Sequence, residues 1–174
     1  MSGRRRAVFL DRDGTLMEET FYCSDPAKVR VYAGVGQALR RLKDAGFLAI
    51  VITNQSGIGR GLFTEAQYQA VHREMLRQIG DKLIDAAYYC PDLPDVPSTR
   101  RKPEPGMVLE AAADFDLDLE HSVFIGDKCI DIECGRRAGT RTIQVLTGYG
   151  RERECGADRV AENFPAAVDL VLEP

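Results

Sequence analysis

Short apolar runs alternate with stretches of helical periodicity along the chain, and this alternation limits the fold more than any other feature of the sequence. The run at 47–52 has six consecutive apolar residues, which is typical of a strand buried on both faces. Buried strands are predicted at 7–10, 47–52, 86–89, 123–125 and 142–146. Helices are predicted at 34–45, 64–79, 105–113, 130–138 and 165–172. Strand–helix alternation of this kind predicts an α/β fold, in which helices cover both faces of a parallel sheet.

Several of the predicted helices carry end signals that do not depend on the apolar pattern. Thr64 and Gln67 have the spacing of a capping box, and Asn163 is a favourable residue to precede the last helix. Gly46 and Gly139 follow two other helices, at positions where glycine commonly ends a helix. These signals place the helix ends close to the limits given above.

The composition is that of an ordinary globular domain. The chain has 174 residues, of which 44% are hydrophobic and 29% charged, so we predict one domain over residues 1–174. No apolar run approaches the ~20 residues of a membrane-spanning helix, and no membrane partner is expected. The net charge is −4, from 23 Lys and Arg against 27 Asp and Glu, which disfavours a nucleic-acid partner.

The cysteines and the N-terminus bear on the compartment. The five cysteines are odd in number and form no C-x-x-C pair, so we expect free thiols in a reducing compartment. Cys129 is expected to pack as a small apolar residue. The arginine triplet at 4–6 is followed by only four apolar residues, too few for the core of a secretory signal. These features predict a cytoplasmic protein.

Ligands of an open parallel sheet bind beyond the carboxyl ends of the strands, and the first predicted strand ends in two aspartates. The sequence there is Asp11-Arg12-Asp13-Gly14-Thr15. In a functional interpretation, Asp11 attacks a phosphorus atom and forms an aspartyl-phosphate. Asp13 then protonates the leaving oxygen and later activates water, because an esterified Asp11 cannot act as the base. The alternative interpretation is a polar turn in which an aspartate caps a helix.

The second and third predicted strands are followed by groups that suit an anion. Residues 53–61 combine small hydrogen-bond donors with three glycines, whose backbone N–H groups can point at a phosphate, and Thr53 offers a hydroxyl. Lys102 follows the third strand and could neutralise phosphoryl charge. Taken alone, the first segment could be a flexible loop and the second a basic surface cluster.

The fourth predicted strand is followed by Gly126-Asp127-Lys128. If this strand neighbours the first, Asp127 lies beside Asp11, and two carboxylates at that distance repel unless a cation separates them. Mg²⁺ fits such an oxygen-rich site. Asp131 lies one helical turn further on, where it either holds a metal-bound water or the Asp127–Lys128 turn, or is an ordinary acid in a first helical turn.

Taken together, these strand ends resemble the haloacid dehalogenase superfamily of phosphohydrolases, whose four motifs match residues 11–15, Thr53, Lys102 and 126–127. Longer segments, 53–61, 89–91, 101–107 and 126–128, resemble the D,D-heptose 1,7-bisphosphate phosphatases, to which histidinol-phosphate phosphatases are closely related. The resemblance implies a Rossmann-like parallel sheet of order 3-2-1-4-5 without a large cap domain. It also implies Mg²⁺-dependent hydrolysis of a small sugar bisphosphate, D-glycero-D-manno-heptose 1,7-bisphosphate, at its 7-phosphate.

The same resemblance assigns roles to individual residues. The implied catalytic residues are Asp11 as nucleophile, Asp13 as proton donor, and Thr53 and Lys102 as stabilisers of the phosphoryl group. The implied magnesium ligands are Asp11, the carbonyl of Asp13, and Asp127. The implied substrate-binding residues are Glu19, Thr20, Phe21, Tyr22, Asn54, Gln55, Ser56, Arg60, Arg101 and Lys128.

One loop departs from the family pattern. The family carries a structural zinc on a C-x-H and C-x-C loop after the third strand, but here only Cys90 matches. Asp92 occupies the histidine position, and the C-x-C pair is absent. Since one thiol cannot build a tetrahedral site, we predict no zinc and expect Pro91, Pro94 and Pro97 to stiffen the loop instead.

Three other functions compete with this interpretation. A histidinol-phosphate phosphatase would share the motifs and differ in substrate. A polynucleotide 3′-phosphatase has a segment similar to 53–61, although the acidic net charge speaks against it. A binding module could keep the fold without catalysis, although its four motifs would then have no purpose. The expected partner is a small phosphorylated metabolite, bound by a monomer.

Overall fold

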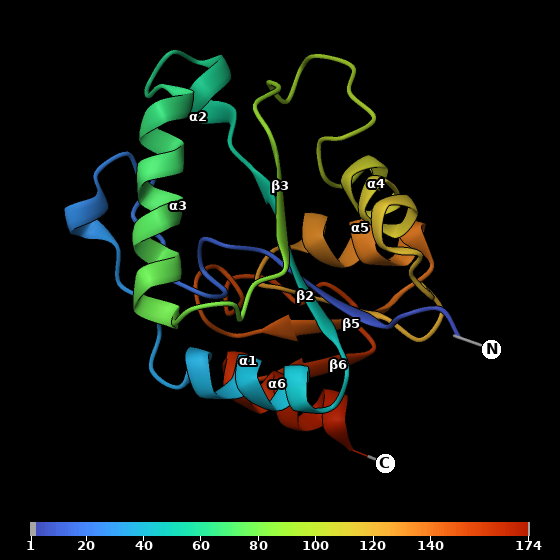
Figure 1. Ribbon diagram of the computed structural model, residues 1–174. Coiled ribbons are helices and arrows are strands. Elements are labelled where there is room, and N and C mark those ends of the chain that lie inside the picture. The colour runs from blue at the N-terminus through green and yellow to red at the C-terminus, as the bar shows by residue number, and fades with distance from the viewer. Residues whose placement is uncertain (1–2, 174) are drawn as a thin grey trace.

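The computed structural model describes residues 3–173 and contains one six-stranded sheet (Figure 1). All the strand pairs are parallel, and the strand order is β3-β2-β1-β4-β5-β6. The strands are β1 (Ala7–Leu10), β2 (Leu48–Asn54), β3 (Ala86–Cys90), β4 (Val123–Gly126), β5 (Arg141–Val145) and β6 (Arg159–Ala161). The predicted order of the first five strands is confirmed, and β1 lies between β2 and β4.

The sixth strand is absent from the sequence prediction. β6 has only three residues, of which Arg159 and Val160 are exposed, so it forms no apolar run. It pairs with β5 at the edge of the sheet, where Ala161 lies opposite Val145. A strand this short is defined by the partner it pairs with, and local composition gives no sign of it.

Helices cover both faces of the sheet, as predicted. The long helices are α1 (Val35–Asp44), α3 (Glu65–Ile79), α4 (Gly106–Phe115), α5 (Cys129–Ala138) and α6 (Phe164–Leu172). Alternate residues of β1 point to opposite faces: Val8 and Leu10 pack with α1, α3 and α6, whereas Ala7 and Phe9 pack with α4 and α5. Figure 1 shows α1 and α6 together on one side of the sheet and α4 and α5 on the other. None of the helices in the described part of the chain has the length and apolar character that a bilayer crossing requires.

The predicted end signals are present. The Thr64 hydroxyl accepts from the backbone N–H of Gln67, and the Gln67 side chain accepts from the backbone N–H of Thr64, which completes the capping box. Asn163 caps α6 through the backbone N–H of Ala166. Gly139 ends α5 in the left-handed region, at φ +84°. The signals read from the sequence therefore set these helix ends.

The segments that connect the elements at the carboxyl edge of the sheet contain little regular structure. Residues 11–34 contain one short 3-10 helix, η1 (Pro26–Lys28), besides isolated bridges. Residues 55–64 contain the single turn α2 (Ser56–Gly59), and 91–105 contain no regular element. No cap domain is therefore evident within residues 3–173, and whatever binds at this edge meets these short segments directly.

Candidate active site

A tight turn after β1 places two carboxylates at the end of the central strand. The backbone N–H of Asp11 donates to the carbonyl of Ile125 on β4 at 3.1 Å, so the strand pairing reaches the first aspartate. The turn then closes through Gly14, whose φ is +85° and whose N–H donates to the Met17 carbonyl at 2.8 Å. A Cβ atom at position 14 would lie 2.2 Å from Asp127 Oδ2, so a larger residue would collide with the carboxylate at the end of β4. Glycine thus lets the two strand ends meet.

Lys102, in the loop after β3, contacts both Asp11 and the end of β2. Its buried Nζ lies 2.9 Å from Asp11 Oδ1, 2.7 Å from Asp131 Oδ1 and 2.8 Å from the Ile52 carbonyl. Burial alone would lower the pKa of Lys102, but the charges of Asp11 and Asp131 outweigh burial and raise it, so the ammonium form is held. The structure therefore brings this predicted cation onto the predicted nucleophile.

Asn54 fixes the backbone of Lys102. Its side-chain amide donates to the Lys102 carbonyl at 3.1 Å and accepts from the Lys102 N–H at 3.0 Å. The amide nitrogen and oxygen of Asn54 therefore both have hydrogen-bond partners within the protein, although Asn54 also lines the cavity described below. The contacts of Asn54 are those of a residue that supports the lysine.

Three buried carboxylates meet at the base of the site. Asp11, Asp127 and Asp131 each offer an oxygen, and these oxygens all lie within 4.8 Å of one another. Burial and the charge of Asp11 raise the pKa of Asp127 to about 9, and the same two causes raise the pKa of Asp131 to about 6. Burial also acts to raise the pKa of Asp11, but Lys102 and Lys128 outweigh it and lower the value. One lysine among three acids leaves excess negative charge, which a hard divalent cation such as Mg²⁺ suits.

The positions of the ligands agree in part with the sequence prediction. Asp11 and Asp127 face each other across the turn, as expected for strands that are neighbours. Asp131, whose role the sequence left open, accepts from Lys102 Nζ through Oδ1 and from the Lys128 N–H at 3.1 Å through Oδ2. It therefore holds the Asp127–Lys128 turn, one of the three roles considered for it.

Asp127 has two further contacts that the sequence did not reveal. The backbone N–H of Tyr149 donates to its Oδ2 at 2.9 Å, and the Thr15 hydroxyl lies 3.4 Å from its Oδ1. Tyr149 belongs to the loop after β5, a segment that the sequence analysis did not connect with the site. Gly148 in this loop also packs on Asp127, because a Cβ there would lie 2.2 Å from Oδ2. The loop after β5 is thus part of the acidic cluster's immediate surroundings.

The site opens into a cavity of about 200 Å³ that brings most of the predicted residues together. Its lining includes Asp11, Asp13, Glu19, Phe21, Tyr22, Thr53, Asn54, Gln55, Ser56, Arg101, Lys102 and Lys128. Four lining residues lie outside the prediction: Cys23, Gly57, Ile130 and Tyr149. Two predicted substrate-binding residues, Thr20 and Arg60, are not among the lining residues, and the Arg60 side chain is exposed. Their prediction rested on the resemblance of the segments that contain them, which does not show the direction of a side chain.

The mouth of the cavity is both charged and aromatic. Lys128 Nζ lies 3.4 Å from Glu19 Oε2 and 5.0 Å from the centre of the Tyr149 ring. Phe21 and Tyr22 both have positive φ, near 53° and 57°, and their rings meet edge to face. Phe21 is 74% exposed, so an apolar ring stands at the rim. The mouth therefore offers a cation, a carboxylate and ring faces to a ligand.

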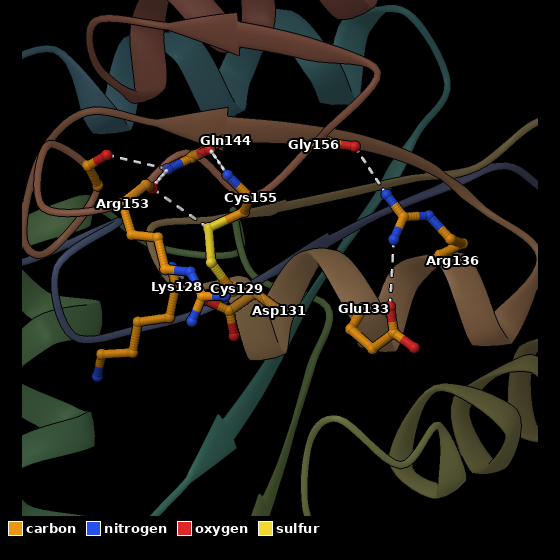
Figure 2. The surroundings of a disulfide bond; sticks show 10 residues. Lys128, Cys129, Asp131, Glu133, Arg136, Gln144, Arg153, Cys155 and Gly156 are labelled. Atoms are coloured by element: carbon orange, nitrogen blue, oxygen red, sulfur yellow. Dashed lines mark hydrogen bonds and ion pairs between the residues drawn. A yellow bond between two sulfur atoms is a disulfide. The ribbon is translucent and has the colours of Figure 1, made fainter.

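The expectation of free thiols is wrong for two of the five cysteines. Cys129, the first residue of α5, forms a disulfide with Cys155 in the loop after β5 (Figure 2). The buried Gln144 side chain supports the same loop: it donates to the carbonyls of Gly150 and Arg153 and accepts from the Cys155 N–H. The two cysteines lie 26 positions apart in sequence, and only the fold brings the ends of α5 and of the loop together. Cys23, Cys90 and Cys134 are free and buried.

Hydrogen bonds within the protein surround Cys90, the one residue that matches the family's zinc loop. The thiol lies 3.4 Å from Asp92 Oδ2 and 3.8 Å from Ser98 Oγ. The Ser98 hydroxyl also accepts from the Arg101 N–H at 3.1 Å, and the Arg101 guanidinium donates to the Asp92 carbonyl at 3.0 Å. These bonds tie the loop to Arg101 and hold that residue at the cavity.

Comparisons with known proteins agree with this geometry. The family described as HAD-hydrolase-like matches residues 99–170. The D-glycero-D-manno-heptose-1,7-bisphosphate 7-phosphatase of Thermosynechococcus vestitus is 39% identical over 187 aligned residues, covering 96% of this chain and 95% of that protein. The corresponding phosphatase of Chlorobaculum tepidum is 37% identical over 183 residues and covers 94% and 92%.

A solved structure extends the similarity to three dimensions. The D,D-heptose 1,7-bisphosphate phosphatase of B. bronchiseptica, crystallised with magnesium and phosphate, superposes with a TM-score of 0.88 at 32% identity, covering 96% of this chain and 98% of that one. The chain belongs to the D,D-heptose 1,7-bisphosphate phosphatase family of the haloacid dehalogenase superfamily.

Proposed function

We propose that the protein is a Mg²⁺-dependent phosphomonoesterase that removes the 7-phosphate of D-glycero-D-manno-heptose 1,7-bisphosphate. The observation that carries the proposal is the buried Asp11 carboxylate, which lies between Lys102 and Asp127 at the base of the cavity. The substrate follows from the curated relatives, which bear the name of this activity and match the chain over nearly its full length.

The chemistry runs as two transfers at one aspartate. Asp11 attacks the phosphorus atom, and the bond to the leaving sugar oxygen breaks as Asp13 supplies a proton. Asp13, now a carboxylate, takes a proton from water as the water oxygen attacks phosphorus. The bond between phosphorus and the Asp11 oxygen breaks, which frees inorganic phosphate and restores the Asp11 carboxylate. Lys102 and the Thr53 hydroxyl stabilise the charge on the transferring oxygens.

The acidic cluster supports the magnesium requirement. Asp11, Asp127 and the carbonyl of Asp13 would hold the ion, and Asp131 would keep the Asp127–Lys128 turn in place. When bound, Mg²⁺ neutralises phosphoryl charge and lets the three carboxylates remain ionised together.

Specificity would come from the short segments at the mouth. Lys128 and Arg101 supply positive charge for the second phosphate, and Glu19 can accept hydrogen bonds from sugar hydroxyls. The ion pair between Lys128 and Glu19 keeps the two groups within reach of one ligand. A substrate with both a phosphate and a polyol chain matches this pairing better than an imidazole alcohol does.

Further proposals concern the protein as a whole. We infer a single-domain cytoplasmic monomer that acts on a small metabolite, binds no nucleic acid and has no zinc at Cys90. The net charge of −4 and the hydrogen-bonded thiol support the last two points. Light scattering tests whether the protein is a monomer, and metal analysis of the purified protein tests whether it binds zinc.

Disulfides are rare in cytosolic proteins, so trapping the thiols at cell lysis tests the compartment together with the Cys129–Cys155 bond.

The function is tested by a kinetic panel with Mg²⁺. Heptose bisphosphate, histidinol phosphate and a 3′-phosphorylated oligonucleotide are compared by kcat/KM, with phosphate release as the readout. We expect the heptose bisphosphate to be preferred, and Asp11→Asn to abolish turnover without loss of the fold. A preference for histidinol phosphate or for the oligonucleotide would overturn the substrate, and substantial turnover by Asp11→Asn would overturn the mechanism. Absence of hydrolysis of every ester would indicate a binding module.

A further inference from the structure

The residue between the two catalytic-turn aspartates has no role in the function proposed above. Arg12 is 0% exposed, which is rare for a guanidinium because burying a charge without a partner is costly. It does not line the cavity, and it lies against the buried Tyr68, with its guanidinium carbon 5.3 Å from the ring centre. The fold thus keeps a full positive charge behind the site.

The buried guanidinium is directed at one carboxylate. Its Nε donates to Asp13 Oδ2 at 2.9 Å and its Nη2 donates to Asp13 Oδ1 at 3.2 Å, so the pair is bidentate. Among residues 3–173, Asp13 is the acidic residue that forms an ion pair with Arg12. The third guanidinium nitrogen of Arg12, Nη1, is buried without a hydrogen-bond partner. The arginine therefore depends on Asp13 for its only ion pair in the described chain.

Asp13 is held from a second side as well. Gln55 Nε2 donates to Asp13 Oδ2 at 3.1 Å and also to the Thr53 hydroxyl at 2.9 Å. Both carboxylate oxygens are thereby fixed, while 14% of the Asp13 side chain stays exposed at the cavity. Arg12 and Gln55 therefore fix the plane of the Asp13 carboxylate, and its exposed part remains accessible from the cavity.

We propose that Arg12 is a positioning residue that orients the Asp13 carboxyl group for proton transfer; this rests on the role of Asp13 in the function proposed above. A planar guanidinium with two parallel N–H groups fixes both position and plane, which the single ammonium of lysine cannot do. Misplacement of a reacting group by about 1 Å costs roughly 10²-fold in rate. Arg12→Lys keeps the charge and loses the geometry.

A chromogenic aryl phosphate separates this role from a structural one. The p-nitrophenolate leaving group needs no proton, so transfer of phosphate from p-nitrophenyl phosphate to Asp11 does not need Asp13. Hydrolysis of the aspartyl-phosphate still does, because water must lose a proton to Asp13. A misplaced Asp13 therefore leaves the first step fast and slows the second.

The experiment is rapid mixing of Arg12→Lys with p-nitrophenyl phosphate and Mg²⁺. We expect a burst of about one p-nitrophenolate per enzyme at a rate within a few-fold of the wild type, followed by a steady state about 10²-fold slower. Asp13→Asn should give the same pattern, and adding Arg12→Lys to Asp13→Asn should slow the steady state no further. Turnover of the heptose bisphosphate by Arg12→Lys should fall with no burst of the dephosphorylated sugar.

Stability is controlled with Tyr68→Leu, which removes the ring beside Arg12 and leaves the ion pair intact. Tyr68→Leu should lower the unfolding temperature, but the ratio of its burst rate to its steady-state rate of p-nitrophenolate release should stay that of the wild type. The proposal is overturned if Arg12→Lys slows both phases equally, if it changes neither, or if Tyr68→Leu reproduces its pattern. A wild-type protein that releases no phosphate from either ester would instead refute the proposed function itself.

Discussion

Reducing the Cys129–Cys155 disulfide should measurably destabilise the protein. The bond closes a segment of 26 positions that contains all of α5, all of β5 and the loop beside Asp127. In the chain-entropy model, a closed loop of that length disfavours the unfolded state by about 3.5 kcal/mol. A loss of that size should lower the unfolding temperature of a domain of this length by roughly 7–14 °C.

The assay is urea unfolding followed by circular dichroism, with and without a dithiol reductant. Titration of the denatured, unreduced protein should give three reactive thiols, those of Cys23, Cys90 and Cys134, and reduction should expose the other two. The double variant Cys129→Ser/Cys155→Ser should have the stability of the reduced protein and should not respond to reductant. Five thiols before reduction, or a midpoint that reductant leaves unchanged, would refute the reasoning.

Three further predictions follow from buried groups and close contacts. Lys102→Met leaves two buried carboxylates without their cation, so it should cost about 3–5 kcal/mol in urea unfolding and about 10²–10³-fold in kcat, and added Mg²⁺ should recover part of the stability. Burial, assisted by a nearby arginine, lowers the pKa of His72 to about 4, so the unfolded chain takes up the proton first. The free energy of unfolding should therefore fall by up to about 3 kcal/mol between pH ~6.5 and ~4, and His72→Phe should remove that part of the slope. Gly148→Ala places a Cβ 2.2 Å from Asp127 Oδ2, whereas Gly139→Ala has a similar positive φ and meets nothing within 4 Å. The positive φ should cost both variants about 1 kcal/mol, the overlap should cost Gly148→Ala about 1–3 kcal/mol more, and only Gly148→Ala should weaken Mg²⁺ binding about 10-fold or more by calorimetry.

The sequence predicts the parts of this protein that depend on local pattern. Continuous apolar runs identify five strands, and the order of strands places Asp11 beside both Lys102 and Asp127. Capping residues such as Thr64 set helix ends because their bonds span only a few residues. Most of the central site could thus be anticipated, since Asp11, Thr53 and Asp127 lie at or next to strand ends, whereas Lys102 lies within the loop between β3 and α4.

The remaining features depend on contacts between distant segments. Tyr149 reaches Asp127 through its backbone N–H, a group that every residue except proline carries, so no side-chain pattern marks it. Cys155 lies in an irregular loop, and its partner is evident only when β5 has brought that loop to α5. The exposure of Arg60 depends on the direction of a short turn, which chain position does not fix. Long-range geometry, and not local chemistry, determines these three features.

The absence of an evident cap within residues 3–173 affects the fate of the phosphoryl group. Phe21 and Tyr22 stand at the rim, and the cavity behind them stays continuous with solvent. Water can therefore reach a phosphorylated Asp11 through this opening as soon as the sugar leaves. Asp13 at the cavity can take a proton from that water, so the open mouth favours release of inorganic phosphate over transfer of the group to a second sugar.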